Sequence, residues 1–218
     1  MKKRIIIAIA LLVLLTTISS KHEIVITKFN LEEIKIENNS IIKEKEIKKL
    51  LFPIYNKNLL FLSNYEIEKA LKQNSFIESF KIKKKYPSTL KIEIYEKKPI
   101  AIIFKKQEKF YLSEKIELIK FKKIEKYKEL PYIFGNEKNF KELYLNLKKI
   151  SFPFNIVKKY TLFELNRWDI ETVNNKLIKL SPERYLDNLK NFLDIRDKKN
   201  FKKYKVFDYR LENQLILN

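Results

Sequence analysis

The chain has few of the side chains that enzymes most often use for chemistry. Its 218 residues include one histidine, His22, and no cysteine. Thiol catalysis, thiolate metal sites and a Ser-His-Asp triad in the body of the chain are therefore excluded. The single glycine, Gly135, also excludes phosphate-binding loops and dinucleotide folds, which need two or three glycines. Carboxylate chemistry and Ser/Lys chemistry stay open, and the latter would be that of a membrane-tethered hydrolase.

The charge balance is strongly basic, with 47 Lys+Arg against 27 Asp+Glu and a formal net charge of +20. An excess of this size is one mark of nucleic-acid-binding proteins. Lysine, however, is spread over almost every segment, which is typical of a solvated surface and not of a binding footprint. We therefore predict no nucleic-acid partner. The only arginines are Arg4, Arg167, Arg184, Arg196 and Arg210.

The N-terminus has the pattern of a membrane-insertion signal. Residues 1–4, with three basic side chains, are a predicted cytoplasmic tail, and the apolar residues 5–20 are a predicted transmembrane helix. At about 1.5 Å per residue this helix would span roughly 24 Å, somewhat short of a ~30 Å hydrocarbon core. The same pattern fits a cleaved signal peptide; we favour a retained anchor. In both cases the rest of the chain is exported.

The exported part shows two different patterns of expected strands and helices, which together predict an α+β fold. Residues 31–96 read as strand, helix, helix, strand and strand, a small βααββ module. Beyond Pro99 several short strand-like runs alternate with two amphipathic helices, so we expect a mixed α/β domain on a largely antiparallel sheet. One of these helices presents Phe140, Leu143, Tyr144 and Leu147 on one face. Residues 205–211 and 214–217 end the chain as a terminal strand that could accept a partner strand.

Several ordered pieces of the sequence resemble the bacterial cell-division family FtsQ/DivIB. The most specific piece is residues 76–101, which are similar to the family's passage "W-P-x-T-L-x-I-x-V-x-E-x-x-P-x-A", with tyrosine in place of the usual tryptophan. The stretch from Leu130 to Gly135 resembles the family's LP…G stretch, and residues 167–180 resemble its "RW-x-L…NG…LG" hairpin. Residues 207–210 resemble its C-terminal strand. The matching positions of the first piece are Tyr86, Pro87, Leu90, Glu96 and Pro99.

The resemblance implies a non-catalytic, single-pass protein of the cell inner membrane at the division septum. It also implies a POTRA domain at 28–97, a β-rich FtsQ-type domain at 98–218 and no cofactor, metal or small-molecule substrate. Its partners would be small coiled-coil division proteins of the FtsB/FtsL type. The terminal strand and the neighbouring hairpin would bind them in the periplasm, by strand addition and through an arginine. The implied partner-binding residues are Arg167, Trp168, Val206, Asp208, Tyr209, Arg210 and Leu211.

Each of these residues also has a purely structural interpretation. Arg167 could form an ordinary surface ion pair, Trp168 could pack in the core, and Asp208 could pair with Arg210 along one strand face. The motif residues of the POTRA hairpin are interpreted as structural. A Ser/Lys hydrolase remains the alternative function, although no Ser–Lys pair stands out. A POTRA-bearing secretion factor would need repeated units or a long β-barrel segment, and the sequence has one unit.

Overall fold

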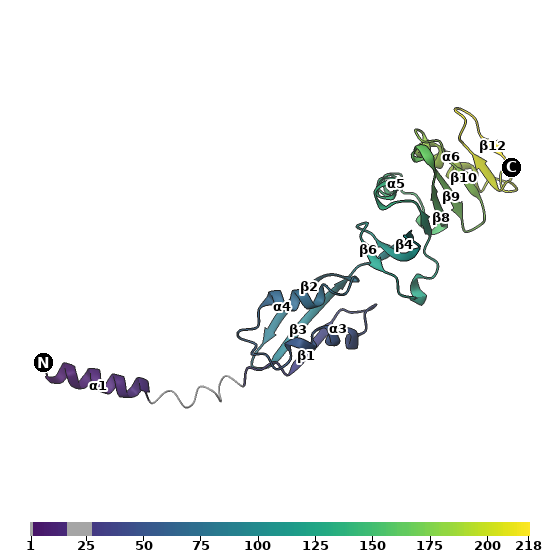
Figure 1. The fold of residues 1–218 in the computed structure, drawn as a ribbon. Coiled ribbons are helices and arrows are strands. Elements are labelled where there is room, and N and C mark those ends of the chain that lie inside the picture. The colour runs from purple at the N-terminus through teal and green to yellow at the C-terminus, as the bar shows by residue number, and fades with distance from the viewer. Residues whose placement is uncertain (1, 17–27) are drawn as a thin grey trace. The chain divides into compact units, whose positions relative to one another are not determined.

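The computed structural model of the protein describes residues 2–16 and 28–218. The chain separates into two compact units, Met1–Lys97 and Lys98–Asn218, with strands and helices in both (Figure 1). The first unit contains helix α1 and the small module that the sequence predicts. The second contains a large sheet with two helices of its own. Each unit is described separately below.

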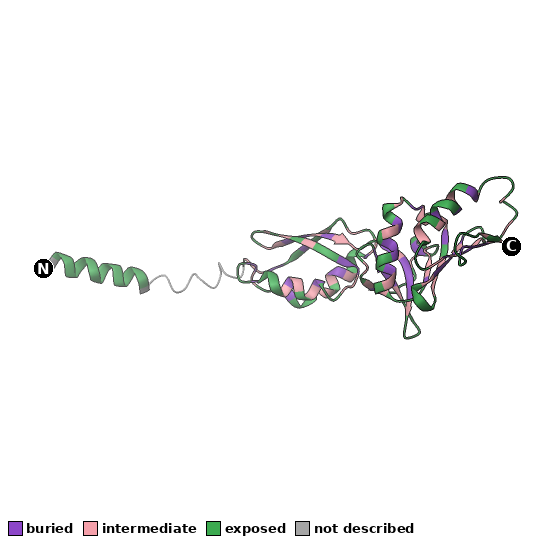
Figure 2. Ribbon diagram, turned by 90° about the horizontal axis from the view of Figure 1, so that it is seen from above, coloured by how far each residue is buried: buried purple, intermediate pink, exposed green. Residues whose placement is uncertain are grey.

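Helix α1, Lys2–Thr16, covers most of the apolar N-terminal segment. Nine Ile, Leu and Val side chains between Ile5 and Leu15 are more than half exposed, and the helix is drawn as exposed in Figure 2. Within residues 2–16 and 28–218, no helix has both the length and the apolar character needed to cross a membrane. The predicted span, 5–20, includes residues 17–20, which lie outside the described residues.

The small module has the predicted order of strand, helix, helix, strand and strand. Its three strands pair in the order β1-β3-β2, with β1 parallel and β2 antiparallel to the central β3. A parallel pair needs a long crossover, and the two helices between β1 and β2 supply it. Ser63 caps the second helix by accepting the Glu66 N–H. The elements are β1 Glu33–Glu37, α3 Glu44–Leu50, the 3₁₀ turn η1 Phe52–Ile54, α4 Asn64–Leu71, β2 Ile77–Lys85 and β3 Thr89–Glu96.

The core of the small module lies between its helices and its sheet. Alternate residues of β3 are fully buried on one face, as are Ile34 of β1 and the inward residues of α3 and α4. This matches the period of two for a strand and the 3.6-residue period of a helix that the sequence shows. The buried side chains are Ile34, Ile47, Leu51, Ile67, Leu71, Leu90, Ile92 and Ile94.

The second unit is built on a nine-stranded sheet with the order β12-β11-β10-β9-β8-β7-β4-β5-β6. Five of its eight strand pairings are antiparallel and three are parallel, so the sheet is mixed, where a largely antiparallel one was expected. Two of the parallel pairings involve β7, a short strand in the middle of the sheet. The strands are β4 Pro99–Lys105, β5 Glu108–Ser113, β6 Leu118–Lys120, β7 Tyr132–Phe134, β8 Val157–Leu162, β9 Trp168–Thr172, β10 Leu177–Lys179, β11 Val206–Asp208 and β12 Ile216–Leu217.

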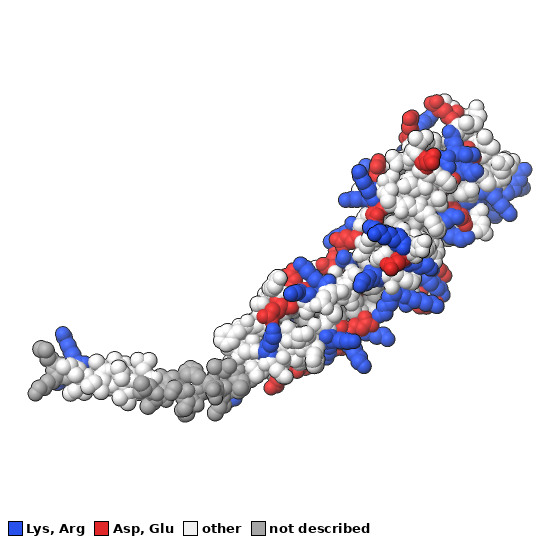
Figure 3. Space-filling model, in the orientation of Figure 1, with Lys and Arg blue, Asp and Glu red and all other residues white. Residues whose placement is uncertain are grey.

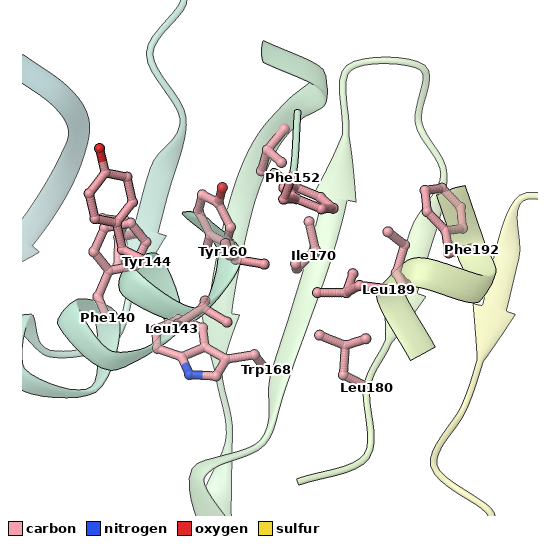
Figure 4. Close-up of a cluster of buried hydrophobic side chains, with 14 of the residues drawn as sticks. Phe140, Leu143, Tyr144, Phe152, Tyr160, Trp168, Ile170, Leu180, Leu189 and Phe192 are labelled. Atoms are coloured by element: carbon pink, nitrogen blue, oxygen red, sulfur yellow. The ribbon is translucent and has the colours of Figure 1, made fainter. Parts of the chain in front are cut away.

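Two helices cover one face of this sheet and enclose its core. Helix α5, Glu137–Lys149, buries the four residues predicted for its inner face, and α6, Tyr185–Ile195, buries Leu189 and Phe192. Their side chains interdigitate with those of the sheet in a continuous cluster (Figure 4). Aromatic rings make edge contacts within it; the Phe192 and Phe207 centroids are 5.0 Å apart. The opposite face of the sheet carries the charged residues described below.

Gly135 lies where the chain passes close to a neighbouring strand. A Cβ atom at this position would lie 2.9 Å from Leu162 Cβ and 3.0 Å from Trp168 Cη2. We therefore expect Gly135→Ala to destabilise the second unit by about 1–3 kcal/mol, as for other overpacked positions. Urea unfolding measures this, with the exposed Lys138→Ala on α5 as the control that leaves the midpoint unchanged. A Gly135→Ala protein as stable as the parent would contradict the close approach.

The surface charge agrees with a dispersed lysine pattern. Lysine and arginine side chains are spread over the visible face of both units, with acidic side chains between them (Figure 3). Many lysines pair with a nearby carboxylate, as Lys48 does with Glu44 and Lys158 with Glu171. Pairs as exposed as these contribute little to stability and leave no concentrated basic footprint.

Candidate functional site

Strand β12 is the edge of the large sheet, with a neighbour on one side only among the described residues. Val206 N–H donates to Asn218 O at 2.7 Å, and Asn218 N–H donates to Val206 O at 3.2 Å, so these two residues form a hydrogen-bonded pair. Hydrogen-bonded and non-hydrogen-bonded pairs alternate along an antiparallel ladder. Leu217, opposite Phe207, is therefore in a non-hydrogen-bonded pair, and its backbone N–H and C=O face away from β11.

The structure corrects the expectation for residues 205–211. They were expected to form the exposed terminal strand, but β11 is paired on both sides, parallel to β10 and antiparallel to β12. The reason is a tight turn after β11, in which Asn213 adopts a positive φ of 56° and returns the chain along the sheet. The unpaired backbone groups thus belong to β12, and Val206 lies one strand inside the edge.

The open face of the sheet next to this edge carries a cluster of charged side chains. Ile170, Ile178 and Phe207 point into the core, so the residues beside them in each strand point to the other face. Strand register then places Asp169, Lys179 and Asp208 side by side across β9, β10 and β11. By the same alternation Arg167 and Arg210 belong to the open face. We call these five residues the edge cluster.

Asp208 is the centre of the edge cluster. Arg210 donates from Nε to Asp208 Oδ1 at 2.9 Å and from a terminal nitrogen to Oδ2 at 2.6 Å, and the Arg210 backbone N–H also donates to Oδ1. These hydrogen bonds from Arg210 hold the pKa of the Asp208 carboxyl below its usual value. Lys179 Nζ adds a second positive charge 3.9 Å from Oδ2. Arg210 is thereby oriented, while nearly half of its side chain stays exposed.

Asp169 and Arg167 form a looser pair in the same cluster. Arg167 Nε is 3.6 Å from Asp169 Oδ1, too long for a hydrogen bond, and neither atom has a hydrogen-bond partner within the described part of the chain. Burial raises the pKa of the Asp169 carboxyl, and the nearby Arg167, Lys179 and Arg210 oppose that shift. The Arg167 guanidinium also lies 4.5 Å from the centre of the Phe163 ring, which fixes its position.

The lowered pKa of Asp208 predicts a pH dependence. A carboxyl with a lowered pKa in the folded state stabilises the protein above its unfolded pKa of about 4, and this contribution is lost as pH falls through the folded pKa. We expect Arg210→Gln to destabilise the protein by about 1 kcal/mol at neutral pH, because the pair is partly exposed. The difference from the parent should vanish in acid. Urea unfolding across this pH range measures it, with exposed Lys199→Gln as control; a pH-independent difference would contradict it.

The remaining predicted partner-binding residues differ in burial, because some point into the core and others do not. Trp168 and Tyr209 alternate with the edge cluster and are buried in the core, where Trp168 packs against Phe140 and the Tyr209 hydroxyl donates to Asn191 at 2.9 Å. Burial raises the pKa of the Tyr209 hydroxyl, so it stays a neutral donor. Leu211 follows the end of β11 and is more than half exposed. Trp168 and Tyr209, the two aromatic residues proposed as partner contacts, are thus too buried to contact a partner.

The motif residues of the first unit have structural roles. The Glu96 carboxylate accepts hydrogen bonds from three successive backbone N–H groups, those of Ser40, Ile41 and Ile42, and from the Ser40 hydroxyl. Leu90 is fully buried, and Tyr86 and Pro87 form the exposed β2–β3 turn. Pro99 begins β4 of the second unit and is buried there. The sequence motif indicates a structural role for Glu96 but not these hydrogen bonds to the 40–42 loop, which we call the Glu96 clasp.

The described residues include no group of three or more His, Cys, Asp or Glu side chains that could hold a metal ion. A cavity of about 510 Å³ lies between α6 and residues 209–215, and its lining is polar, with Arg184 donating to Asn213 across it at 2.7 Å. Ser181 at its rim pairs with the Asn188 side chain. The hydroxyls of Ser63 and Ser113 accept backbone N–H groups. These serines serve caps and turns and do not form a Ser–Lys pair.

A family model described as "POTRA domain, FtsQ-type" matches residues 29–97. The chain is also similar to the cell division protein FtsQ of Rickettsia conorii, with 29% identity over 194 residues that cover 87% of this chain and 72% of the relative. Along most of its length, the chain is therefore similar to FtsQ proteins. The FtsQ of Rickettsia typhi is 28% identical over the same share of both chains, and that of Cellvibrio japonicus is 20% identical over 147 residues. The FtsQ resemblance that the sequence motifs indicate is thus confirmed, and these relatives indicate a cell-division protein with a POTRA domain.

Proposed function

We propose that this protein is a non-catalytic scaffold, anchored in the inner membrane at the division site by its N-terminal helix. Helix α1 is apolar on all sides, which suits a lipid environment better than a water-facing surface. Lys2, Lys3 and Arg4 precede the apolar residues, and basic residues favour the cytoplasmic side. In this topology residues 1–4 are cytoplasmic, residues 5–20 span the bilayer, and the POTRA domain at 28–97 and the β-rich domain at 98–218 are periplasmic.

The scaffold binds other division proteins by adding a partner strand to β12. The observation that carries this proposal is the outward-facing backbone N–H and C=O of Leu217 at an uncovered sheet edge. Main-chain hydrogen bonds of this kind give affinity in strand addition, and neighbouring side chains give specificity. The partner is a small coiled-coil division protein of the FtsB/FtsL type, the class that the family resemblance implies.

The edge cluster supplies the specificity. Asp208 holds Arg210 by hydrogen bonds, and the Phe163 ring together with the nearby Asp169 positions Arg167 on the same face of the sheet. A guanidinium that is already oriented loses little side-chain entropy when it binds a carboxylate. A partner strand bearing an acidic residue on its open-face side would therefore bind next to β12 in a fixed register. This assigns Arg167, Arg210 and Leu211 to contacts, Val206 and Asp208 to positioning, and Trp168 and Tyr209 to the core beneath.

Depletion and rescue in the native cell test the division role. We expect loss of the protein to give long, undivided filaments, and the parent gene to restore septation. Rescue should fail with Leu217→Pro, which removes the outward N–H, and should succeed with Leu217→Ala, which keeps it. Normal septation after complete depletion would contradict the scaffold role. Rescue by both variants would contradict strand addition at β12 but not the scaffold role.

A further inference from the structure

The first unit exposes more large hydrophobic side chains than its small core requires. Within residues 28–97 they come from the η1 turn, the loop that follows it, the first turn of α4 and the β2–β3 turn. Phe61 is 78% exposed, and Leu60 beside it is 47% exposed. Single exposed apolar residues are ordinary, but a group of them in one place marks an interaction surface. The five residues are Phe52, Leu60, Phe61, Tyr65 and Tyr86.

Hydrogen bonds place this group at one end of the domain. Leu59 N–H donates to Phe29 O at 2.7 Å, which joins the loop to the residue where the described domain begins. Lys84 Nζ donates to Leu62 O at 2.6 Å and brings the end of β2 to the same loop. The Tyr86 ring packs edge-on against Phe29, with centroids 6.0 Å apart. We call this end of the domain, with its five exposed side chains, the entry end.

The other exposed residues follow from the course of the chain. Strand β1 runs away from the entry end and α3 returns to it, so Phe52 follows α3 there, with its ring 6.4 Å from Tyr55. Tyr65 begins α4, which runs away again. The opposite end contains the Glu96 clasp and the exposed Gln73. Within residues 28–97 that opposite end has none of the five exposed hydrophobic side chains.

Lysines surround the apolar side chains at the entry end. Lys45, Lys48 and Lys49 line an open hollow of about 550 Å³ together with Phe52. Lys84 and the exposed Lys85 precede the Tyr86 turn. Four acidic residues lie near these lysines: Glu44 pairs with Lys48 at 2.7 Å, Glu66 with Lys57 at 2.6 Å and Glu33 with Lys35 at 3.4 Å, and Glu32 is exposed. Cations are thus in excess around the apolar group, which is the composition of surfaces that rest on anionic lipid headgroups.

We infer that the entry end docks on the surface of the bilayer that holds the chain's own N-terminal helix, an inference that rests on the proposed membrane anchoring. Phe61 and Leu60 would enter the headgroup region while the lysines contact lipid phosphates. Eight residues, 21–28, join the proposed span to this end, and eight residues reach at most about 29 Å. Every anchored molecule therefore has the bilayer within reach of its entry end. Such a tether raises the effective concentration, so that even a weak contact is populated.

The absence of cysteine allows a direct test in the full-length chain. Phe61→Cys creates a single thiol for an environment-sensitive fluorophore, and Gln73→Cys provides the matched probe at the opposite end of the same domain. Both proteins are reconstituted in vesicles of phosphatidylcholine with phosphatidylglycerol, with and without brominated acyl chains. We expect the probe at position 61 to shift to the blue and to lose intensity with brominated lipid. The probe at position 73 should keep its aqueous emission.

Each other outcome decides between specific alternatives. If the protein floats with the vesicles but the probe at position 61 stays aqueous, the docking inference is wrong and the anchor stands. If the protein does not float, the proposed anchoring fails first. Equal quenching at both positions would mean non-specific adsorption and would overturn the inference. A shift at position 61 that requires a purified partner protein and not lipid would assign the surface to that protein. Vesicles of phosphatidylcholine alone should weaken the signal, because the lysines then lose their anionic ligands.

Discussion

Replacing Glu96 by alanine is expected to destabilise the POTRA domain by about 2–3 kcal/mol. The Glu96 carboxylate accepts the backbone N–H groups of Ser40, Ile41 and Ile42 at 2.7–3.0 Å. These donors belong to the loop between β1 and α3, and alanine would leave them without their acceptor. The cost stays below that of a fully buried charge because this site is only partly buried.

Amide hydrogen exchange of the full-length chain measures this effect on the first unit alone. Exchange in β1 and β3 should accelerate in Glu96→Ala, while strands of the second unit keep the rate of the parent. The control is Glu32→Ala, since the Glu32 side chain is exposed at the opposite end of the domain. Equal protection of β1 in the parent and in Glu96→Ala would contradict the structural role given to this carboxylate.

Leu217→Pro is expected to weaken binding of the coiled-coil partner at least about tenfold, the equivalent of one lost backbone hydrogen bond. Proline removes the outward-facing N–H of β12 and leaves the hydrogen-bonded pair of Val206 and Asn218 in place. Leu217→Ala is the matched control, because it shortens the side chain and keeps the donor. Titration of the reconstituted protein with the partner measures both affinities.

The structural integrity of the proline variant needs its own measurement. Val206 N–H donates to Asn218 O, so its exchange rate reports whether β12 still pairs with β11. We expect this amide to stay protected in Leu217→Pro while partner binding falls. If Leu217→Ala weakens binding as much as Leu217→Pro, the side chain and not the backbone edge would carry the interaction.

The parts of the fold that could be predicted from the sequence have strong local patterns. The inward face of α5 is a 3.6-residue repeat of large apolar residues, and all four predicted members are buried. The turn at 174–175 follows from two asparagines, one of which, Asn175, adopts the positive φ that such turns require. The order of elements in the POTRA domain follows from alternating runs separated by turn residues.

The parts that were missed depend on contacts between distant segments. Strand β7 has three residues, Tyr132–Phe134, too few for an alternating pattern, and it forms only because β4 and β8 hold it on both sides. Residues 205–211 and 214–217 were assigned together to the terminal strand, whereas in the structure β11 lies one strand inside the edge and β12 forms it. Asn213 is a local turn signal, but which strand then forms the edge depends on how the returning chain pairs with β11.

The candidate site shows the same division between what the sequence reveals and what only the fold reveals. Arg167, Asp208 and Arg210 were identified from the motifs, and strand alternation brings them to one face. Asp169 and Lys179 join them only because β9, β10 and β11 are neighbours in the sheet. Trp168 shares its motif with Arg167 but points into the core, since adjacent strand residues face opposite sides.

The central claim is that a partner strand pairs with β12, and residue-resolved amide exchange tests it most directly. The full-length protein in vesicles is compared with and without a coiled-coil division protein of the FtsB/FtsL type from the same cell. We expect the Leu217 amide to become protected on binding, while the Asn218 amide, which already donates to Val206 O, changes little. A bound partner that leaves Leu217 exchange unchanged would contradict strand addition at this edge.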